Sequence, residues 1–330
     1  MDNQITNIFN STMMSSALSA AYELGLIEEL QEKKVIEINE FSQEKDLHQP
    51  SVEAIISALC CCNICQIDDS NIRVTQGKSF EEAYNYKGYF LWLIRGYGNL
   101  LQNLACITKN ENRSNDFIKR DGKYIALAGK DYGQQFVDSY FEEILEEFPY
   151  KYIADLGCGS GAKLINIARK SSEVRAIGVD VNSGAVKTAQ TAVANAGLQS
   201  RIKIIESDMN KLKFQEEFAE VEVLFSFFNG HDLWPRHNCL NFLKNLHLVF
   251  PNVKRFLLCD TYRSNTIPSN NVPIFTLGFE FTHGIMGQYI PSLNDWLDLF
   301  VDSGWQCIEH RDIGIPFSTI FDLRPNRNSN

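Results

Sequence analysis

Three glycines at alternate positions, Gly157, Gly159 and Gly161, stand near the middle of the chain. They follow an apolar run that ends near Asp155, and a helical pattern of apolar residues comes after them. This order predicts a strand, a tight turn and a helix, because glycine lets the backbone turn sharply and lets a ligand approach it closely. Such a turn can hold a nucleotide-containing cofactor, and an ordinary strand-to-helix turn without a cofactor is the alternative.

Acidic residues end the next two predicted strands. The segment AIGVDVN places Asp180 about 20 residues after the turn, where a carboxylate can accept hydrogen bonds from ribose hydroxyls. The segment IKIIESDMN ends a third strand at Asp208, which Met209 follows. These acids favour the cofactor site over the plain turn.

A second group of chemically active side chains follows the predicted fourth strand, VEVLFSFF. The segment NGHDLWP places His231 and Asp232 at the carboxyl end of that strand, where parallel sheets bind ligands. His283 lies in a long insertion rich in Pro, Gly and Asn, and such insertions tend to carry function. Two imidazoles and one carboxylate on loops form the facial triad that suits non-haem iron. The alternatives are His231 as an isolated general base and His283 as a loop residue bonded to backbone.

The elements that must position these residues form three predicted parts. Residues 1–90 lack a βαβ pattern and are predicted as helices followed by a small β-wing, a winged-helix-like domain. Residues 91–150 form a helical connecting layer, in which Arg95 interrupts an apolar helix and needs a partner. Residues 151–330 alternate apolar strands with helices, which predicts an α/β core with a Rossmann-like sheet.

Composition argues against several classes of function. The chain has 330 residues and a net charge of −10, which disfavours nucleic acid as a partner. No apolar run reaches the roughly 18 residues of a membrane span, and the N-terminus lacks a basic and apolar signal. We therefore expect a cytoplasmic protein without a membrane partner.

Four cysteines cluster between residues 60 and 65, as CCCNIC. No second cysteine or histidine pair stands nearby to complete a zinc site. The surrounding segment predicts an apolar helix, in which cysteine serves as a small hydrophobe. We expect buried thiols there.

The glycine turn and its acids resemble those of a class I S-adenosylmethionine-dependent methyltransferase. The motifs are DLGCGSG, the acid ending the second strand and SDM after the third, and GxGxG spacing differs from the GxGxxG of nicotinamide dehydrogenases. The resemblance implies that Asp155 and the glycines border the methionine end of the cofactor. It also implies that Asp180 binds the ribose and that Asp208 and Met209 border the adenine. Its small-molecule members have a seven-stranded Rossmann-like core and an N-terminal winged-helix-like domain that forms a homodimer.

Four further motifs resemble the 2-oxo acid C-methyltransferases of natural-product pathways: GHDLWP, FTHG, GYFLWLIRG and RDGKYIA. This resemblance covers nearly the whole chain and implies that His231, Asp232 and His283 hold an iron or other metal ion. It implies methylation of the carbon next to the ketone through a metal-stabilised enolate. Arg120 of the RDG turn is expected to pair with the substrate carboxylate, and Arg95 is the other candidate. Phenylpyruvate, indolepyruvate and 2-oxo-5-guanidinopentanoate all remain candidate substrates.

Two other functions stay open at this stage. One is a metal-independent O-methyltransferase for a phenol or hydroxy acid, with His231 as general base. The other is a catalytically inactive dimer that binds S-adenosylmethionine as a sensor. The intact DLGCGSG and GHD motifs and Asp180 argue against the second.

Overall fold

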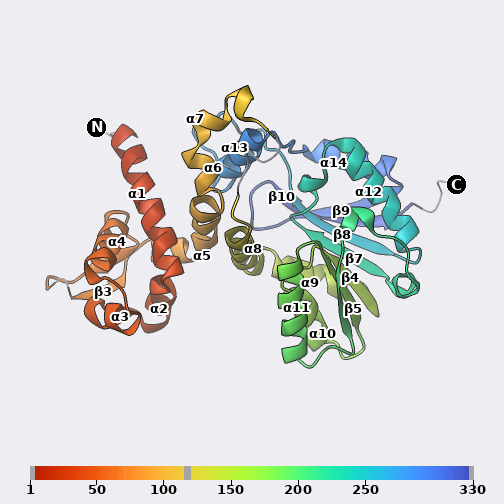
Figure 1. Ribbon diagram of the computed structural model, residues 1–330, viewed down its shortest axis with the longest axis horizontal. Coiled ribbons are helices and arrows are strands. Elements are labelled where there is room, and N and C mark those ends of the chain that lie inside the picture. Colours follow the sequence, from red (N-terminus) through yellow and green to blue (C-terminus); the bar gives the residue numbers. More distant parts are fainter. Residues whose placement is uncertain (1–3, 71, 115–119, 327–330) are drawn as a thin grey trace. The chain divides into compact units, whose positions relative to one another are not determined.

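A computed structural model describes residues 4–70, 72–114 and 120–326 (Figure 1). The chain divides into two compact units, residues 1–135 and 136–330. The sequence predicts three parts, for dimerisation (1–90), connection (91–150) and catalysis (151–330). The roles of these parts remain predictions.

The N-terminal unit packs helices around a small antiparallel sheet of order β1-β3-β2, in which β3 is the central strand of the predicted wing. Its core is formed by apolar residues such as Leu18, Leu30 and Phe41, which come from three different helices. The elements are α1 (Gln4–Glu23), α2 (Leu26–Lys33), β1 (Val35–Glu37), α3 (Ile38–Glu44), α4 (Gln49–Cys61), β2 (Cys65–Ile67), β3 (Arg73–Gln76), α5 (Phe80–Leu91), η1 (Trp92–Gly96), α6 (Gly98–Gln102), α7 (Leu104–Ile107), η2 (Asn110–Asn112) and α8 (Gly122–Phe136).

The apolar helix that contains Arg95 is interrupted, although its sequence predicts a continuous one. After α5 the chain forms the π-helical turn η1, and Arg95 stands in this turn. Its Nε lies 3.1 Å from a carboxylate oxygen of Glu23, and it donates a 2.7 Å hydrogen bond to the hydroxyl of Tyr124. The expected partner therefore exists, inside the N-terminal unit.

The single helix that the segment DYGQQFVDSYFEEILEEF predicts is two helices in the structure. Val137 has the non-helical angles φ −124° and ψ −43°, and it separates α8 from α9. Apolar periodicity continues through the break, so the sequence pattern did not reveal it. The break lies next to the boundary between the two units, which falls between Gln135 and Phe136.

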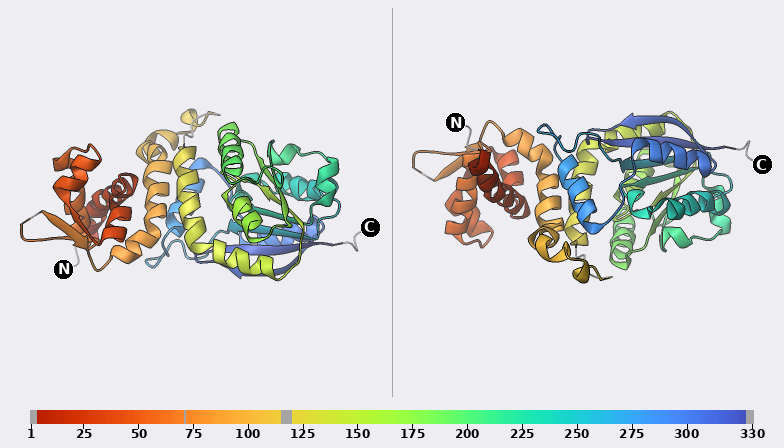
Figure 2. Two further views of the ribbon diagram at one scale, coloured as in Figure 1. Left: turned by 90° about the horizontal axis from the view of Figure 1, so that it is seen from below. Right: turned by 90° about the horizontal axis from the view of Figure 1, so that it is seen from above.

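A seven-stranded sheet of order β6-β5-β4-β7-β8-β10-β9 forms the centre of the C-terminal unit. Strands β4 to β8 pair in parallel, and β10 pairs antiparallel with β8 and β9. Figure 1 shows α9, α10 and α11 on one side of the sheet and α12 and α14 on the other, and Figure 2 shows the same layers from two further directions. This arrangement confirms the predicted Rossmann-like core.

Helices on both faces explain why the central strands β4 and β8 are buried at every position. The elements of this unit are α9 (Asp138–Glu146), β4 (Tyr152–Leu156), α10 (Ala162–Lys170), β5 (Arg175–Asp180), α11 (Ser183–Asn195), β6 (Ile202–Glu206), η3 (Met209–Lys211), η4 (Glu216–Glu220), β7 (Val223–Phe227), η5 (His231–Leu233), α12 (Arg236–Val249), β8 (Arg255–Thr261), α13 (Thr276–Met286), α14 (Leu293–Asp302), β9 (Trp305–Asp312) and β10 (Ser318–Pro325).

The cysteine cluster lies at the end of α4 and the start of β2. Cys65 is buried, Cys60 and Cys62 are half-buried, and Cys61 is exposed. The prediction of buried thiols is therefore wrong for Cys61. α4 buries only one face, and Cys61 lies on the other.

Candidate active site

The glycine turn after β4 has a backbone that only glycine adopts easily. Gly157, Gly159 and Gly161 have φ angles of 91°, 52° and 72°, in the left-handed region that disfavours other residues. A Cβ on Gly157 would lie 2.3 Å from Nδ2 of Asn229, whereas one on Gly159 would meet no described atom within 4 Å. The backbone at Gly159 is therefore open to a ligand.

Asp180 lies beside this turn, as its position at the end of β5 predicts. Its Oδ2 accepts a 2.8 Å hydrogen bond from the backbone N–H of Gly159, and its Oδ1 accepts one of 2.8 Å from Asn182. The next residue, Val181, is 69% exposed and places an apolar side chain at the same edge of the sheet.

Asp208 caps the short helix η3 that begins with Met209. Its Oδ1 accepts a 2.9 Å hydrogen bond from the backbone N–H of Asn210, and this bond lowers the pKa of the carboxyl. The acids that end β5 and β6 thus lie at the carboxyl edge with the glycine turn, since neighbouring parallel strands end together.

Asp155 is buried within β4 at the base of the turn. Burial raises its pKa to about 8, the positive charge of Lys163 opposes this rise, and the negative charge of Asp180 adds to it. A cationic ligand at this end of the sheet would favour the ionised carboxylate.

His231 stands in η5, just after β7, and is held by a residue from the neighbouring strand β8. Its Nδ1 lies 2.7 Å from Oδ1 of the buried Asp260, and its backbone N–H donates a 2.8 Å hydrogen bond to Oδ2. A carboxylate only accepts, so Nδ1 carries the hydrogen and Nε2 is the acceptor nitrogen. A Cβ at Gly230 would lie 2.6 Å from Asp260 Oδ2, which explains the glycine before His231.

His283 lies in the helix α13, so the prediction that it stands on a loop is wrong. Its Nδ1 lies 2.6 Å from the carbonyl oxygen of Phe279, one turn earlier, and its ring packs against the Phe279 ring. This bond assigns the hydrogen to Nδ1, as in His231. The burial of Phe279 and His283 on one face explains why a helix forms in a segment with several helix-disfavouring residues.

The two imidazoles lie together although 51 residues separate them in the chain. Their ring centres are 5.1 Å apart and their planes meet at 81°. Both rings are buried, and both have Nδ1 bound to an acceptor of the protein. The pair that the sequence predicts is thus brought together.

Asp232 is less closely engaged with this pair. Its side chain is 37% exposed, and its Oδ1 lies 3.9 Å from Nε2 of His231. The same oxygen accepts a 2.6 Å hydrogen bond from Nε2 of Gln288. Within residues 4–70, 72–114 and 120–326, no group of three or more His, Cys, Asp or Glu side chains is arranged to hold a metal ion. The metal therefore stays a prediction.

Arg120, the predicted partner of the substrate carboxylate, belongs to the N-terminal unit. It is exposed and stands two residues before α8. Its role stays a prediction.

Asp260 and Gln288 are site residues that sequence reasoning missed. Asp260 belongs to the buried strand of LLCDTY, and an acid near the end of a parallel strand is the signal that identified Asp155 and Asp180. Gln288 has no comparable signal, because nothing local to it indicates a contact with Asp232.

Solved structures of similar fold come from small-molecule methyltransferases. Human N-acetylserotonin methyltransferase in complex with S-adenosylmethionine has a TM-score of 0.72 at 13% identity, covering 98% of this chain and 99% of that one. The mitomycin 7-O-methyltransferase MmcR has a TM-score of 0.68 at 14% identity, covering 98% and 97%. Fold and glycine turn together define the class I methyltransferase architecture.

Sequence relatives agree with this class. Residues 153–250 match the family described as a methyltransferase domain. Methyltransferase ungE' of Aspergillus campestris is 34% identical over 330 residues, covering 97% of this chain and 96% of that protein. Indolepyruvate C-methyltransferase of Streptomyces griseus is 24% identical over 331 residues, covering 97% and 95%. The chain belongs to the S-adenosylmethionine-dependent methyltransferases.

Proposed function

We propose that this enzyme methylates a 2-oxo acid at the carbon next to the ketone. The proposal rests on the contact between the buried rings of His231 and His283, each of which has its hydrogen fixed on Nδ1. A general base for O-methylation needs one imidazole, and a second buried one beside it then has no function in the reaction. The relative from Streptomyces griseus, named for C-methylation of indolepyruvate, supports the same chemistry.

The proposal includes a metal ion held by His231, Asp232 and His283. The donor set fits, because two imidazoles that present Nε2 and one nearby carboxylate suit non-haem iron. A metal ion there would supply Lewis acidity to the keto and carboxylate oxygens of the substrate, which makes the neighbouring C–H more acidic. Oδ1 of Asp232 accepts a hydrogen bond from Gln288, and a carboxylate has further lone pairs that could bind a metal ion.

The residues of the chain have separate tasks in this reaction. Asp260 and the Phe279 carbonyl orient the two imidazoles, which is how outer partners commonly fix ligand histidines. Burial of both rings excludes water from this end of the site. The glycine turn holds the cofactor with its methyl group near the acceptor, and Arg120 binds the substrate carboxylate.

Metal-independent O-methylation is the second candidate, and the His231–Asp260 pair favours it. A carboxylate that fixes the imidazole with its hydrogen on Nδ1 prepares Nε2 to accept a proton from a hydroxyl group. In that reaction His283 only packs against His231.

Replacing His283 with Ala separates the two candidates. C-methylation with a metal predicts that the variant loses bound metal and turnover of 2-oxo acids, while S-adenosylmethionine affinity stays within about twofold. The matched control is His237→Ala, which removes an exposed histidine of α12. Metal per subunit and transfer of a labelled methyl group to a panel of 2-oxo acids and phenols are the measurements. A metal-free His283→Ala protein that keeps the parental rate would support O-methylation instead.

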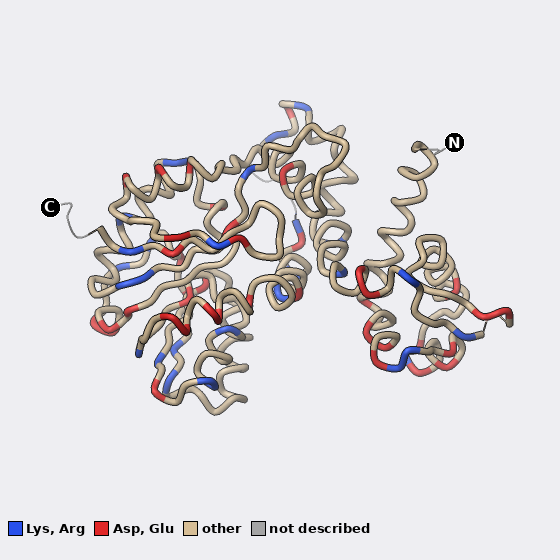
Figure 3. Tube along the Cα trace, turned by 180° about the vertical axis from the view of Figure 1, so that it is seen from behind, with Lys and Arg blue, Asp and Glu red and all other residues tan. Residues whose placement is uncertain are grey.

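We also propose that the N-terminal unit forms a homodimer. The first half of α1 carries an exposed apolar stripe of Ile5, Ile8, Phe9 and Met13, and Ile5 and Phe9 are 74% and 71% exposed. Such a stripe at helical spacing is typical of a protein interface. Figure 3 shows Lys and Arg interspersed with Asp and Glu along both units, a pattern that does not suggest a nucleic-acid surface. Among the described helices, none is long and apolar enough to cross a membrane.

Sedimentation tests the dimer. Phe9→Glu should give monomers at micromolar concentration, whereas Ile72→Glu, at an exposed apolar residue beside β3, should leave the dimer intact. A monomeric parent protein would contradict the proposal.

A further inference from the structure

Lys163 is a cation at the methionine end of the predicted cofactor site. It stands in the first turn of α10, two residues after Gly161. Its ammonium pairs with Asp138 of α9 and lies 4.9 Å from the centre of the Phe227 ring, at the end of β7. It is also close enough to Asp155 to lower the pKa of that carboxyl against the effect of burial. Lys163 thus lies at the carboxyl edge of the sheet.

The cofactor brings both signs of charge to this edge. The methionine end of S-adenosylmethionine carries an ammonium and a carboxylate, and its sulfur is a cation. Asp138 and Asp180 supply negative charge for the cations, and Asp155 adds to it once a bound cation favours its ionised form, but these carboxylates repel the carboxylate of the cofactor. The carboxylate therefore needs a positive group. Lys163 meets this need, and it stands at the N-terminus of α10, where the helix dipole also favours an anion.

We propose that Lys163 binds the carboxylate of the cofactor's methionine end. Asp138 holds the lysine in position when no cofactor is bound and is then a positioning residue. The inference depends on the cofactor alone, so it holds whichever acceptor the enzyme methylates.

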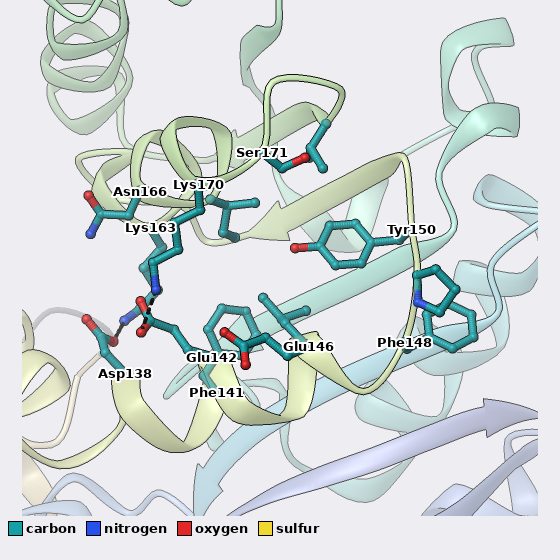
Figure 4. A pocket seen from close by; sticks show the side chains of 14 residues that line it. Asp138, Phe141, Glu142, Glu146, Phe148, Tyr150, Lys163, Asn166, Lys170 and Ser171 are labelled. Carbon is teal, nitrogen blue, oxygen red and sulfur yellow. Dashed lines mark hydrogen bonds and ion pairs between the residues drawn. The ribbon is translucent and has the colours of Figure 1, made fainter.

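The surroundings give the ion pair room to rearrange. A cavity of about 320 Å³ lies between α9 and α10, and Lys163 and Asp138 line it together with apolar side chains such as Phe141 and Ile167 (Figure 4). Because Asp138 itself lines the cavity, its side chain has free space beside it.

A second lysine on the same helix provides a matched control. Lys170 lies two turns after Lys163 and pairs with Glu142 of α9 at 2.7 Å, also lining the cavity (Figure 4). The Lys170 side chain is 57% exposed against 26% for Lys163, and Lys170 stands at the opposite end of α10 from the glycine turn. Both lysines join α9 to α10, but only Lys163 neighbours the cofactor site.

Calorimetric titration of Lys163→Met and Lys170→Met with two ligands tests the inference. The ligands are S-adenosylhomocysteine and its decarboxylated analogue, which lacks only the carboxylate. We expect Lys163→Met to bind S-adenosylhomocysteine at least tenfold more weakly, about 1.4 kcal/mol, because a charge-assisted hydrogen bond is lost. Its affinity for the decarboxylated analogue should change less than twofold. Lys170→Met should bind both ligands as the parent does.

Two results would overturn the inference. One is an unchanged affinity of Lys163→Met for S-adenosylhomocysteine. The other is an equal loss of affinity for both ligands, which would mean that Lys163 only maintains the packing of α9 on α10. Lys163→Arg, which keeps the charge, should restore at least half of the lost binding free energy. If Lys163→Met does not fold, Lys163→Gln provides the same comparison.

Discussion

The proposed cofactor end and the proposed acceptor end of the C-terminal unit are built in different ways. The cofactor end uses one continuous part of the chain, from Asp155 to Met209, and depends on backbone conformation and on acids at strand ends. The acceptor end combines His231 after β7, Asp260 in β8 and His283 in α13. Its geometry therefore depends on side chains that meet only after the sheet has formed.

Burial adds a second difference between the two ends. His231, Asp260 and His283 are all buried and only Asp232 is exposed at the acceptor end, whereas at the cofactor end Asp180 and Asp208 are partly exposed and only Asp155 is buried. Buried polar groups are costly unless each has its partner, so the acceptor end behaves as one connected network. We expect substitutions there to disable the reaction, and those at the cofactor end to weaken binding.

Removal of His231 should have the largest effect. His231→Ala should lower turnover about 1,000-fold, in line with the contribution of a base or ligand in the reaction. Its affinity for S-adenosylmethionine should stay within about twofold, because His231 lies outside the glycine turn at which the cofactor is proposed to bind. The exposed His310→Ala serves as control. A parallel loss of cofactor affinity in His231→Ala would erase the distinction between the two ends.

Asp260→Asn should have the next largest effect. The amide would present a donor to the ring or to a backbone N–H, so it cannot replace all three hydrogen bonds that Asp260 accepts from His231 and Thr261. We expect turnover to fall about 100-fold, as the imidazole loses its fixed hydrogen on Nδ1. The double variant with His231→Ala should be no slower than His231→Ala alone. An additive loss would show that Asp260 acts independently of His231.

Asp180→Ala should weaken cofactor binding but spare the chemical step. We expect at least tenfold weaker S-adenosylmethionine binding, about 1.4 kcal/mol, with turnover at saturating cofactor largely retained. Glu206→Ala, at the exposed end of the neighbouring strand β6, is the matched control. Titration that shows equal affinity for Asp180→Ala and the parent would remove Asp180 from the cofactor site.

Asp155→Asn should have the smallest effect, on stability. Burial raises the pKa of Asp155 to about 8 in the folded protein, against an ordinary value of 3.8. The unfolded chain therefore releases this proton first as pH rises, and the folded state loses stability between about pH 4 and pH 8. The amide has no proton to lose. The unfolding temperature of the cofactor-free variant should therefore exceed that of the parent by an amount that grows as the pH rises to 8. A difference in unfolding temperature that is constant from pH 5 to pH 8 would contradict this shift.

Much of the cofactor end could be predicted from the sequence. Glycines at positive φ, apolar strands and acids at strand ends depend on conformation over a few residues, and this local information survives in one sequence. The same signal, applied to LLCDTY, would also have identified Asp260.

Only the tertiary structure decided the acceptor end. His283 was expected on a loop, but burial of one face of α13 makes a helix there and turns the ring toward His231. The contact of Gln288 with Asp232 and the break at Val137 likewise leave no local trace in the sequence. The physical reason is the distance along the sequence over which each property is determined. Backbone conformation depends on neighbouring residues, whereas a contact between distant side chains depends on how a helix is rotated and on where distant strands end.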